Sequence, residues 1–114
     1  MRFVDYINSI SDIQFTNTRL MGVVGGYVTF SVDDNVVYEV FHVDFEDYGI
    51  DRYERLINPD PHSFDNIIKE VCGGLGGEFI SISLGAMTSI ICEGYALNLR
   101  LNTKSKIDEM YYKR

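Results

Sequence analysis

The strongest constraint on the fold is a pair of segments in which apolar and polar residues alternate. The first segment, residues 20–32, is rich in Val, Tyr, Thr and Phe and places Val28 and Phe30 on one face of an extended chain. The second, residues 36–45, follows at once after Asp33-Asp34-Asn35, whose residue types tolerate turn geometry. The sequence therefore predicts an antiparallel hairpin.

Apolar residues at helical spacing occur in further segments. Residues 1–13 carry one such stripe, which predicts an N-terminal helix. The clearest helix is predicted over residues 63–72, with Ser63 placed to cap its first amides and Gly73 placed to end it in the left-handed conformation. A short C-terminal helix is predicted from about Ser105.

Strand-like alternation returns after the glycine-rich segment 73–77. Residues 80–84 and 91–101 both alternate, and a turn over residues 85–88 joins them into a second hairpin. A chain of 114 residues, 46% of them hydrophobic, has the size and composition for one core. We therefore expect a single α+β domain over residues 1–114, with a mainly antiparallel sheet of about four strands (two hairpins) and helices packed on one face.

The chain shows no segment for secretion or for crossing a membrane. Its longest apolar stretch, residues 20–28, is interrupted by glycines and is far shorter than the roughly 20 residues of a bilayer span. Polar residues interrupt the N-terminal segment where a signal peptide needs an apolar run. Cys72 and Cys92 are too few for a disulfide framework, and we expect both to be reduced and buried. These observations predict a cytoplasmic protein.

Two apparent ligand motifs fail on spacing. The glycines at 73–77 follow a predicted helix and are not followed by Lys and Ser or Thr, so they do not match a phosphate loop. A calcium loop counted from Asp44 has Tyr48 at its fifth position and Arg55 at its twelfth, where a bidentate glutamate is required. The histidines and cysteines lack the spacing of zinc ligands. We therefore expect no cofactor and no metal.

Negative charge is concentrated in one segment. The chain has 17 acidic and 10 basic residues and a net charge of -7, and residues 33–54, with eight acids and only Arg52 as a base, carry that whole excess. Tyrosines lie among these acids, and tyrosine often anchors protein interfaces. An acidic surface attracts cationic proteins and repels nucleic-acid phosphates. The predicted partner-binding residues are Asp33, Asp34, Asp44, Glu46, Asp47, Tyr48, Asp51, Tyr53 and Glu54.

In size and charge the chain resembles the small acidic inhibitors of bacterial toxin systems, the immunity proteins and antitoxins. Those proteins are not enzymes, and they neutralise a basic toxin by covering its active cleft. The resemblance implies an inhibitor of a basic protein such as a nuclease, with no direct binding of nucleic acid. It is a resemblance of general character, because proteins of this kind share no common fold.

Three alternatives stay open at this point. The acidic segment is also compatible with a hydrated exterior that only confers solubility. His42 and Asp44 lie two residues apart on one strand face, as a base and its orienter do in a small enzyme or ligand-binding domain that uses a cysteine. The strands that begin near Leu20 and Ile90 would leave edges for pairing with a second copy in a homo-oligomer.

Overall fold

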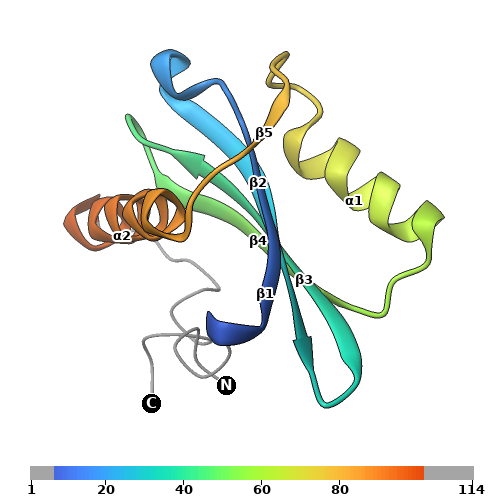
Figure 1. The fold of residues 1–114 in the computed structure, drawn as a ribbon. Coiled ribbons are helices and arrows are strands. Elements are labelled where there is room, and N and C mark those ends of the chain that lie inside the picture. The colour runs from blue at the N-terminus through green and yellow to red at the C-terminus, as the bar shows by residue number, and fades with distance from the viewer. Residues whose placement is uncertain (1–6, 102–114) are drawn as a thin grey trace.

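A computed structural model describes residues 7–101 of the chain. Its five strands form one antiparallel sheet in the order β4-β3-β2-β1-β5, and its two longer helices lie on opposite faces of that sheet (Figure 1). The elements, with η for a 3-10 helix, are η2 (Ile7–Ser9), β1 (Ile10–Thr16), η3 (Arg19–Met21), β2 (Val23–Val32), β3 (Asn35–Asp44), β4 (Gly49–Ile57), α1 (Pro61–Cys72), β5 (Phe79–Ser81) and α2 (Leu84–Leu101).

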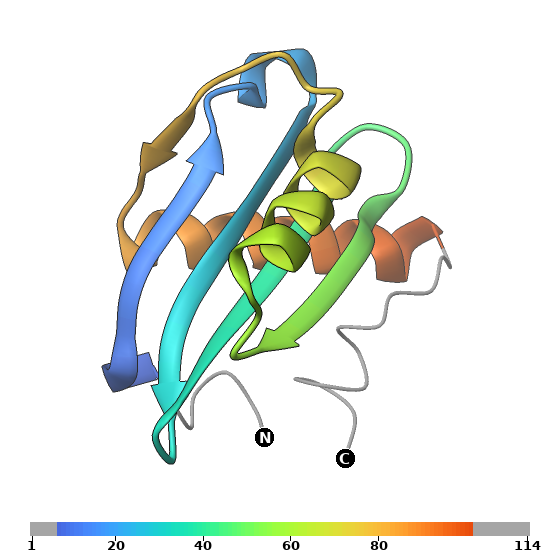
Figure 2. The ribbon, with the colours of Figure 1, turned by 90° about the vertical axis from the view of Figure 1, so that its right-hand side faces the viewer.

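This architecture confirms the predicted α+β class with a mainly antiparallel sheet, which has five strands where about four were expected. The helices were expected on one face, but α1 covers one face and α2 the other (Figure 2). The reason is that the central strands are apolar on both sides. Val28 and Phe41 face α2, whereas Tyr27 and Val40 face α1. A sheet with two apolar faces requires cover on both.

The predicted hairpin is present as β2 and β3, which pair from Val23 and Asp44 to Val32 and Asn35. Asp33 and Asp34 make its turn with φ values of 49° and 67°. Two successive left-handed residues match the turn type whose twist fits paired antiparallel strands, and aspartate tolerates this conformation. The short turn fixes the register of the hairpin and therefore decides which side chains face each helix.

The prediction of a helix over residues 1–13 is wrong from Ile10 onward. The segment Ile10–Thr16 forms β1, which pairs with β2 on one side and with β5 on the other. Ile13 and Phe15 are buried and the residue between them is only half-buried, so the segment alternates as a strand does. Its polar residues are weak helix formers, and pairing with two strands outweighs the helical stripe. Residues 1–6 lie outside the described residues.

The predicted second hairpin is also wrong, because Leu84–Leu101 is one helix. Leu97, Leu99 and Leu101 alternate along the sequence, but only the first of them is buried. The buried residues of α2 instead recur at helical spacing: Met87, Ile91, Gly94, Leu97 and Asn98. Of the strand predicted over residues 80–84, a short β5 is present. The helix predicted from Ser105 lies outside the described residues.

β4 was not predicted, because its sequence does not alternate. A β-bulge shifts the register of its pairing with β3 between His42 and Val43, so the core residues Ile50 and Tyr53 are three positions apart. β4 and β5 are the two edges of the sheet. The edges expected near Leu20 and Ile90 do not form, because β2 is an inner strand and Ile90 lies in α2.

The predicted helix near residues 63–72 is confirmed as α1, which begins at Pro61. Its N-cap is Asp60 and not Ser63. The Asp60 carboxylate accepts hydrogen bonds from the Ser63 backbone N–H at 2.9 Å and from the Ser63 hydroxyl at 3.0 Å. These hydrogen bonds hold the pKa of Asp60 below its usual value. Gly73 follows the helix with a right-handed φ of -65°, where the left-handed conformation was expected.

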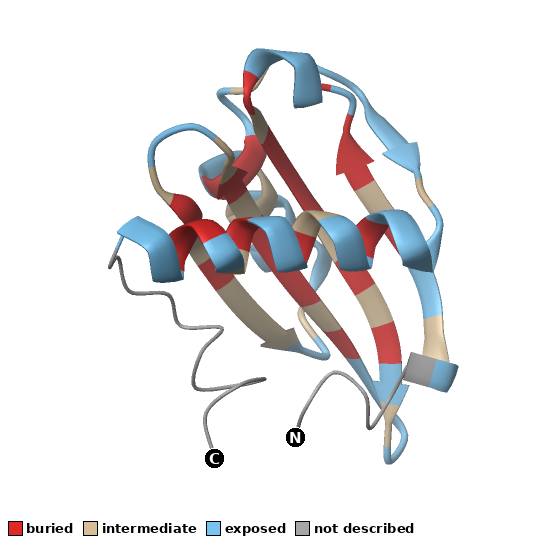
Figure 3. Ribbon diagram, turned by 90° about the vertical axis from the view of Figure 1, so that its left-hand side faces the viewer, coloured by how far each residue is buried: buried red, intermediate tan, exposed pale blue. Residues whose placement is uncertain are grey.

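Two groups of buried side chains hold the layers together. The larger lies between α2 and the sheet, where Figure 3 shows buried positions on both. It contains the rings of Phe15, Phe30 and Phe41. The smaller lies between α1 and the sheet, around Val40 and Val71. Burial of each such side chain is worth about 1.5–3 kcal/mol. Within residues 7–101, neither helix has both the length and the hydropathy that crossing a membrane requires.

Gly26 lets the sheet accept the Phe15 ring, and its replacement tests this packing. The two residues are cross-strand partners, and a Cβ on Gly26 would overlap the ring. We predict that Gly26→Ala lowers the free energy of unfolding by roughly 1–3 kcal/mol, measured by urea denaturation. Gly74→Ala is the control, because a Cβ there meets nothing within 4 Å, and its change should stay within about 0.5 kcal/mol. Equal effects of the two substitutions would contradict the packing described.

Candidate functional site

The structure divides the predicted partner-binding residues among three places. Asp33 and Asp34 form the β2–β3 turn, Asp44 to Tyr48 lead through the β3–β4 turn, and Asp51, Tyr53 and Glu54 lie on β4. The two turns are at opposite ends of β3, whose 10 residues span roughly 30 Å. The nine residues therefore do not form one continuous surface.

The β3–β4 turn holds an exposed acidic pair, Glu46 and Asp47. Asp44 Oδ1 accepts hydrogen bonds from the backbone N–H groups of Glu46 and Asp47, both at 2.9 Å. These bonds fix the turn and leave the side chains of Glu46 and Asp47 exposed. Within residues 7–101 no basic side chain forms an ion pair with either carboxylate. Two adjacent carboxylates are thus presented to solvent on an ordered backbone.

The acids of β4 are partly neutralised by bases of the chain itself. Asp51 Oδ1 is hydrogen-bonded to His42 Nδ1, on the neighbouring strand. Arg52 pairs with Glu54 at 3.0 Å and with Glu70 of α1 at 2.9 Å. Hydrogen bonds that the Arg52 guanidinium donates to these two carboxylates, with Glu70 the larger contribution, raise its pKa. The carboxylates of Asp51 and Glu54 therefore have partners within the chain.

The two tyrosines of the predicted set have different roles. Tyr53 is 5% exposed, and its hydroxyl donates a hydrogen bond to the buried carboxylate of Glu39. Burial raises the pKa of this hydroxyl, so Tyr53 is a neutral core residue. Its predicted role as an interface anchor is therefore corrected: it has almost no surface for a partner. Tyr48 is half-buried in the β3–β4 turn and stays a candidate anchor.

Asn98 of α2 supports this turn, and sequence reasoning missed it. Asn98 is 1% exposed. Its Oδ1 accepts a hydrogen bond from the Ile50 N–H at 2.8 Å. Its Nδ2 donates to the carbonyl oxygen of Tyr48 at 3.1 Å and to that of Ile50 at 3.3 Å. The amide thus bonds to the edge of β4 as a neighbouring strand would. Placing residues 91–101 in a strand hid this role, because Asn98 joins the buried face only when the segment is a helix.

The histidine expected to act as a base has a different partner from the one predicted. His42 pairs with Asp51, whereas Asp44 holds the turn. Gly25 is the cross-strand partner of His42, and a Cβ atom added to Gly25 would lie 2.7 Å from Cys72 Sγ. Cys72 therefore lies near His42, on the same face of the sheet. Among the described residues, no hydrogen bond joins this thiol to His42. Burial raises the pKa of Cys72 to about 11, so the thiol is protonated at neutral pH.

Cys92 occupies the opposite side of the sheet. It is exposed on the outer face of α2, where a buried position was expected, because the segment is a helix and not a strand. The two cysteines are free and separated by the sheet. Across the described part of the chain, no group of three or more His, Cys, Asp or Glu side chains is arranged to hold a metal ion.

Comparison of the chain with family models, with curated proteins and with solved structures found no match.

The reactivity of the two thiols tests whether Cys72 is an activated nucleophile. We predict that iodoacetamide at pH 7.5 alkylates Cys92 and modifies Cys72 at least about 100-fold more slowly, because Cys72 is buried and protonated. Peptide mass spectrometry over a time course measures both rates, and Cys92→Ser isolates the slower one. Rapid alkylation of Cys72, suppressed by His42→Ala, would instead favour the enzyme alternative.

Proposed function

We propose that this domain is a non-enzymatic binding module for a basic protein partner, and that the β3–β4 turn with the adjoining face of β4 is its contact surface. The observation that carries the proposal is the pair of exposed carboxylates of Glu46 and Asp47, on a turn fixed by Asp44 and Asn98. A fixed backbone lowers the entropy lost when these side chains bind.

The charge of the whole described region supports a cationic partner. Residues 7–101 contain fourteen acidic and five basic residues, and Arg19 and Arg52 are already paired with acids of the chain. Such a surface accelerates encounter with a basic protein through long-range attraction. Tyr48, half-buried beside the acidic pair, supplies apolar contact area of the kind that slows dissociation.

In its most specific form, the proposal is an immunity or antitoxin type of inhibitor. The carboxylates would occupy the positions that nucleic-acid phosphates take in the cleft of a basic toxin such as a nuclease. Asp51 and Glu54 would form the rim of this contact, since Asp51 is already hydrogen-bonded to His42 and Glu54 is paired with Arg52. Asp33 and Asp34 lie at the far end of the β2–β3 hairpin and are outside the proposed surface.

We also propose a cytoplasmic location. Two free cysteines, one of them exposed on α2, suit a reducing compartment better than an oxidising one. In the homo-oligomer alternative, a second copy would pair with the edge strands β4 or β5. Light scattering at low concentration tests this alternative.

Two charge-matched double variants test the proposed surface. Glu46→Gln with Asp47→Asn removes two charges from the β3–β4 turn, and Asp33→Asn with Asp34→Asn removes two from the opposite end. Both pairs of substitutions keep the size of the side chains, and asparagine tolerates the left-handed turn at residues 33 and 34. Each protein is used for affinity capture from native lysate, and a captured protein is identified by mass spectrometry and measured by surface plasmon resonance.

We predict that a basic partner is retained by the wild type and by the 33/34 variant. The 46/47 variant should bind about tenfold or more weakly, mainly because its association rate is lower. The association rate of the wild type should also fall when salt is added. If the same partner binds both variants with equal rates and no salt dependence, the proposed contact surface is wrong.

A further inference from the structure

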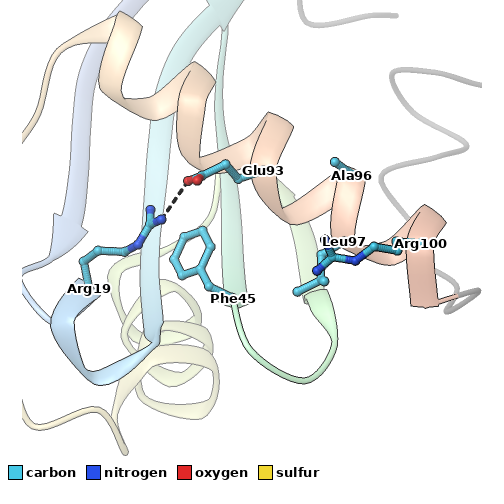
Figure 4. Close-up of a pocket in the computed structure, with 6 residues that line it drawn as sticks. All are labelled: Arg19, Phe45, Glu93, Ala96, Leu97 and Arg100. Atoms are coloured by element: carbon cyan, nitrogen blue, oxygen red, sulfur yellow. Dashed lines mark ion pairs between the residues drawn. The ribbon is translucent and has the colours of Figure 1, made fainter.

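A pocket of about 290 Å³ lies between α2 and η3, beside the β3–β4 turn, from which Phe45 contributes to its lining. Arg19, Phe45, Glu93, Ala96, Leu97 and Arg100 line it (Figure 4). Three of these residues are apolar and three are charged, and small-molecule sites likewise combine apolar area with a few polar groups. The volume is at the lower end of such sites, which start at roughly 300 Å³, so an occupant must be small.

The first guanidinium of the pocket is held in place. Arg19 lies 3.6 Å from the centroid of the Phe45 ring and 2.8 Å from Glu93 Oε2. The ring and the carboxylate together restrict its position. The side chains of Arg19 and Glu93 are still 49% and 53% exposed, so the remaining N–H donors of Arg19 are accessible.

The second guanidinium has no partner of opposite charge within residues 7–101. Arg100 lies two helical turns after Glu93, and its side chain extends back along α2 over Leu97 toward the pocket (Figure 4). Among the described residues, no carboxylate forms an ion pair with Arg100. The pocket therefore contains two cations and one anion, an excess of one positive charge in a chain whose net charge is -7.

We infer that this pocket binds a monocarboxylate that carries a small apolar group. The carboxylate would bridge Arg100 and the accessible donors of Arg19, whose planar guanidinium groups match the geometry of a carboxylate. The apolar group would lie on Ala96 and Leu97. An excess of one positive charge fits a monoanion, and the negative charge of the whole chain opposes multiply charged ligands such as nucleotides.

This chemistry has two natural sources, a free carboxylic acid and the C-terminal residue of a polypeptide. Phenylacetate represents the first, and a tripeptide with a blocked amine and C-terminal phenylalanine represents the second. Phenylacetamide and the C-terminal amide of the same peptide are uncharged controls of the same shape. The inference does not depend on the proposed function, because it concerns different residues and a ligand of opposite charge.

The test is a titration of the isotopically labelled protein followed by amide chemical shifts at low salt. We predict saturable shifts at residues 96 and 97 with one or both carboxylates, and none with the amides. Arg100→Gln should weaken binding about tenfold or more, because a charge-assisted hydrogen bond is lost. Lys69→Gln, which removes a positive charge from α1 on the other face of the sheet, should leave the affinity unchanged.

Each result is decisive for this pocket. Tighter binding of the peptide identifies a chain terminus as the preferred source, and tighter binding of phenylacetate identifies a free acid. Equal shifts with the amides, equal affinity of the wild type and Arg100→Gln, or no saturable shift would overturn the inference. Arg100 is exposed and unpaired among the described residues, so we expect Arg100→Gln to fold. A dispersed amide spectrum of this variant would show that it is folded.

Discussion

The side chain of Asn98 joins α2 to the edge of β4, and the candidate sites depend on this contact. Its amide satisfies both the N–H and the carbonyl of Ile50 and the carbonyl of Tyr48. Gly94 makes the contact possible, because a Cβ at that position would lie 2.8 Å from a Val43 methyl and 2.9 Å from Ile50 Cγ1. Close approach of the helix and a buried polar clamp therefore act together.

This contact places two surfaces of opposite charge on the same side of the fold. The β3–β4 turn carries the exposed carboxylates of Glu46 and Asp47, and Phe45, which precedes them, contributes to the pocket that Arg19 and Arg100 line. The clamp and the close packing of Gly94 against Val43 and Ile50 together set the position of the turn relative to α2. The acidic surface and the cationic pocket are thus products of the same packing.

The parts of the fold that were predicted from the sequence are those set by local interactions. The β2–β3 hairpin depends on alternation and on two turn residues that accept positive φ, and α1 depends on one apolar stripe between a cap and a glycine. β1, β4 and α2 depend on partners distant in the chain. β1 forms because β2 and β5 flank it, and the bulge opposite His42 removes the alternation from β4.

The same distinction applies to the candidate site. The excess of acids in residues 33–54 is visible in the sequence, but their division among the two turns, β4 and a buried Glu39 follows from how β2, β3 and β4 pair. Tyr53 was expected at the surface because its strand was not predicted. Asn98 and the pocket were missed because both depend on which residues share a face of α2. Those faces exist only when residues 84–101 are helical.

Native-state hydrogen exchange of the Ile50 amide tests the central claim most directly. Val28, in the middle of the sheet, is the internal reference for global unfolding. The account predicts that Asn98→Ala accelerates exchange at Ile50 by at least about tenfold relative to Val28, because the amide loses its buried acceptor. An unchanged ratio of the two exchange rates would show that Asn98 does not hold the edge of β4, and the account would be contradicted.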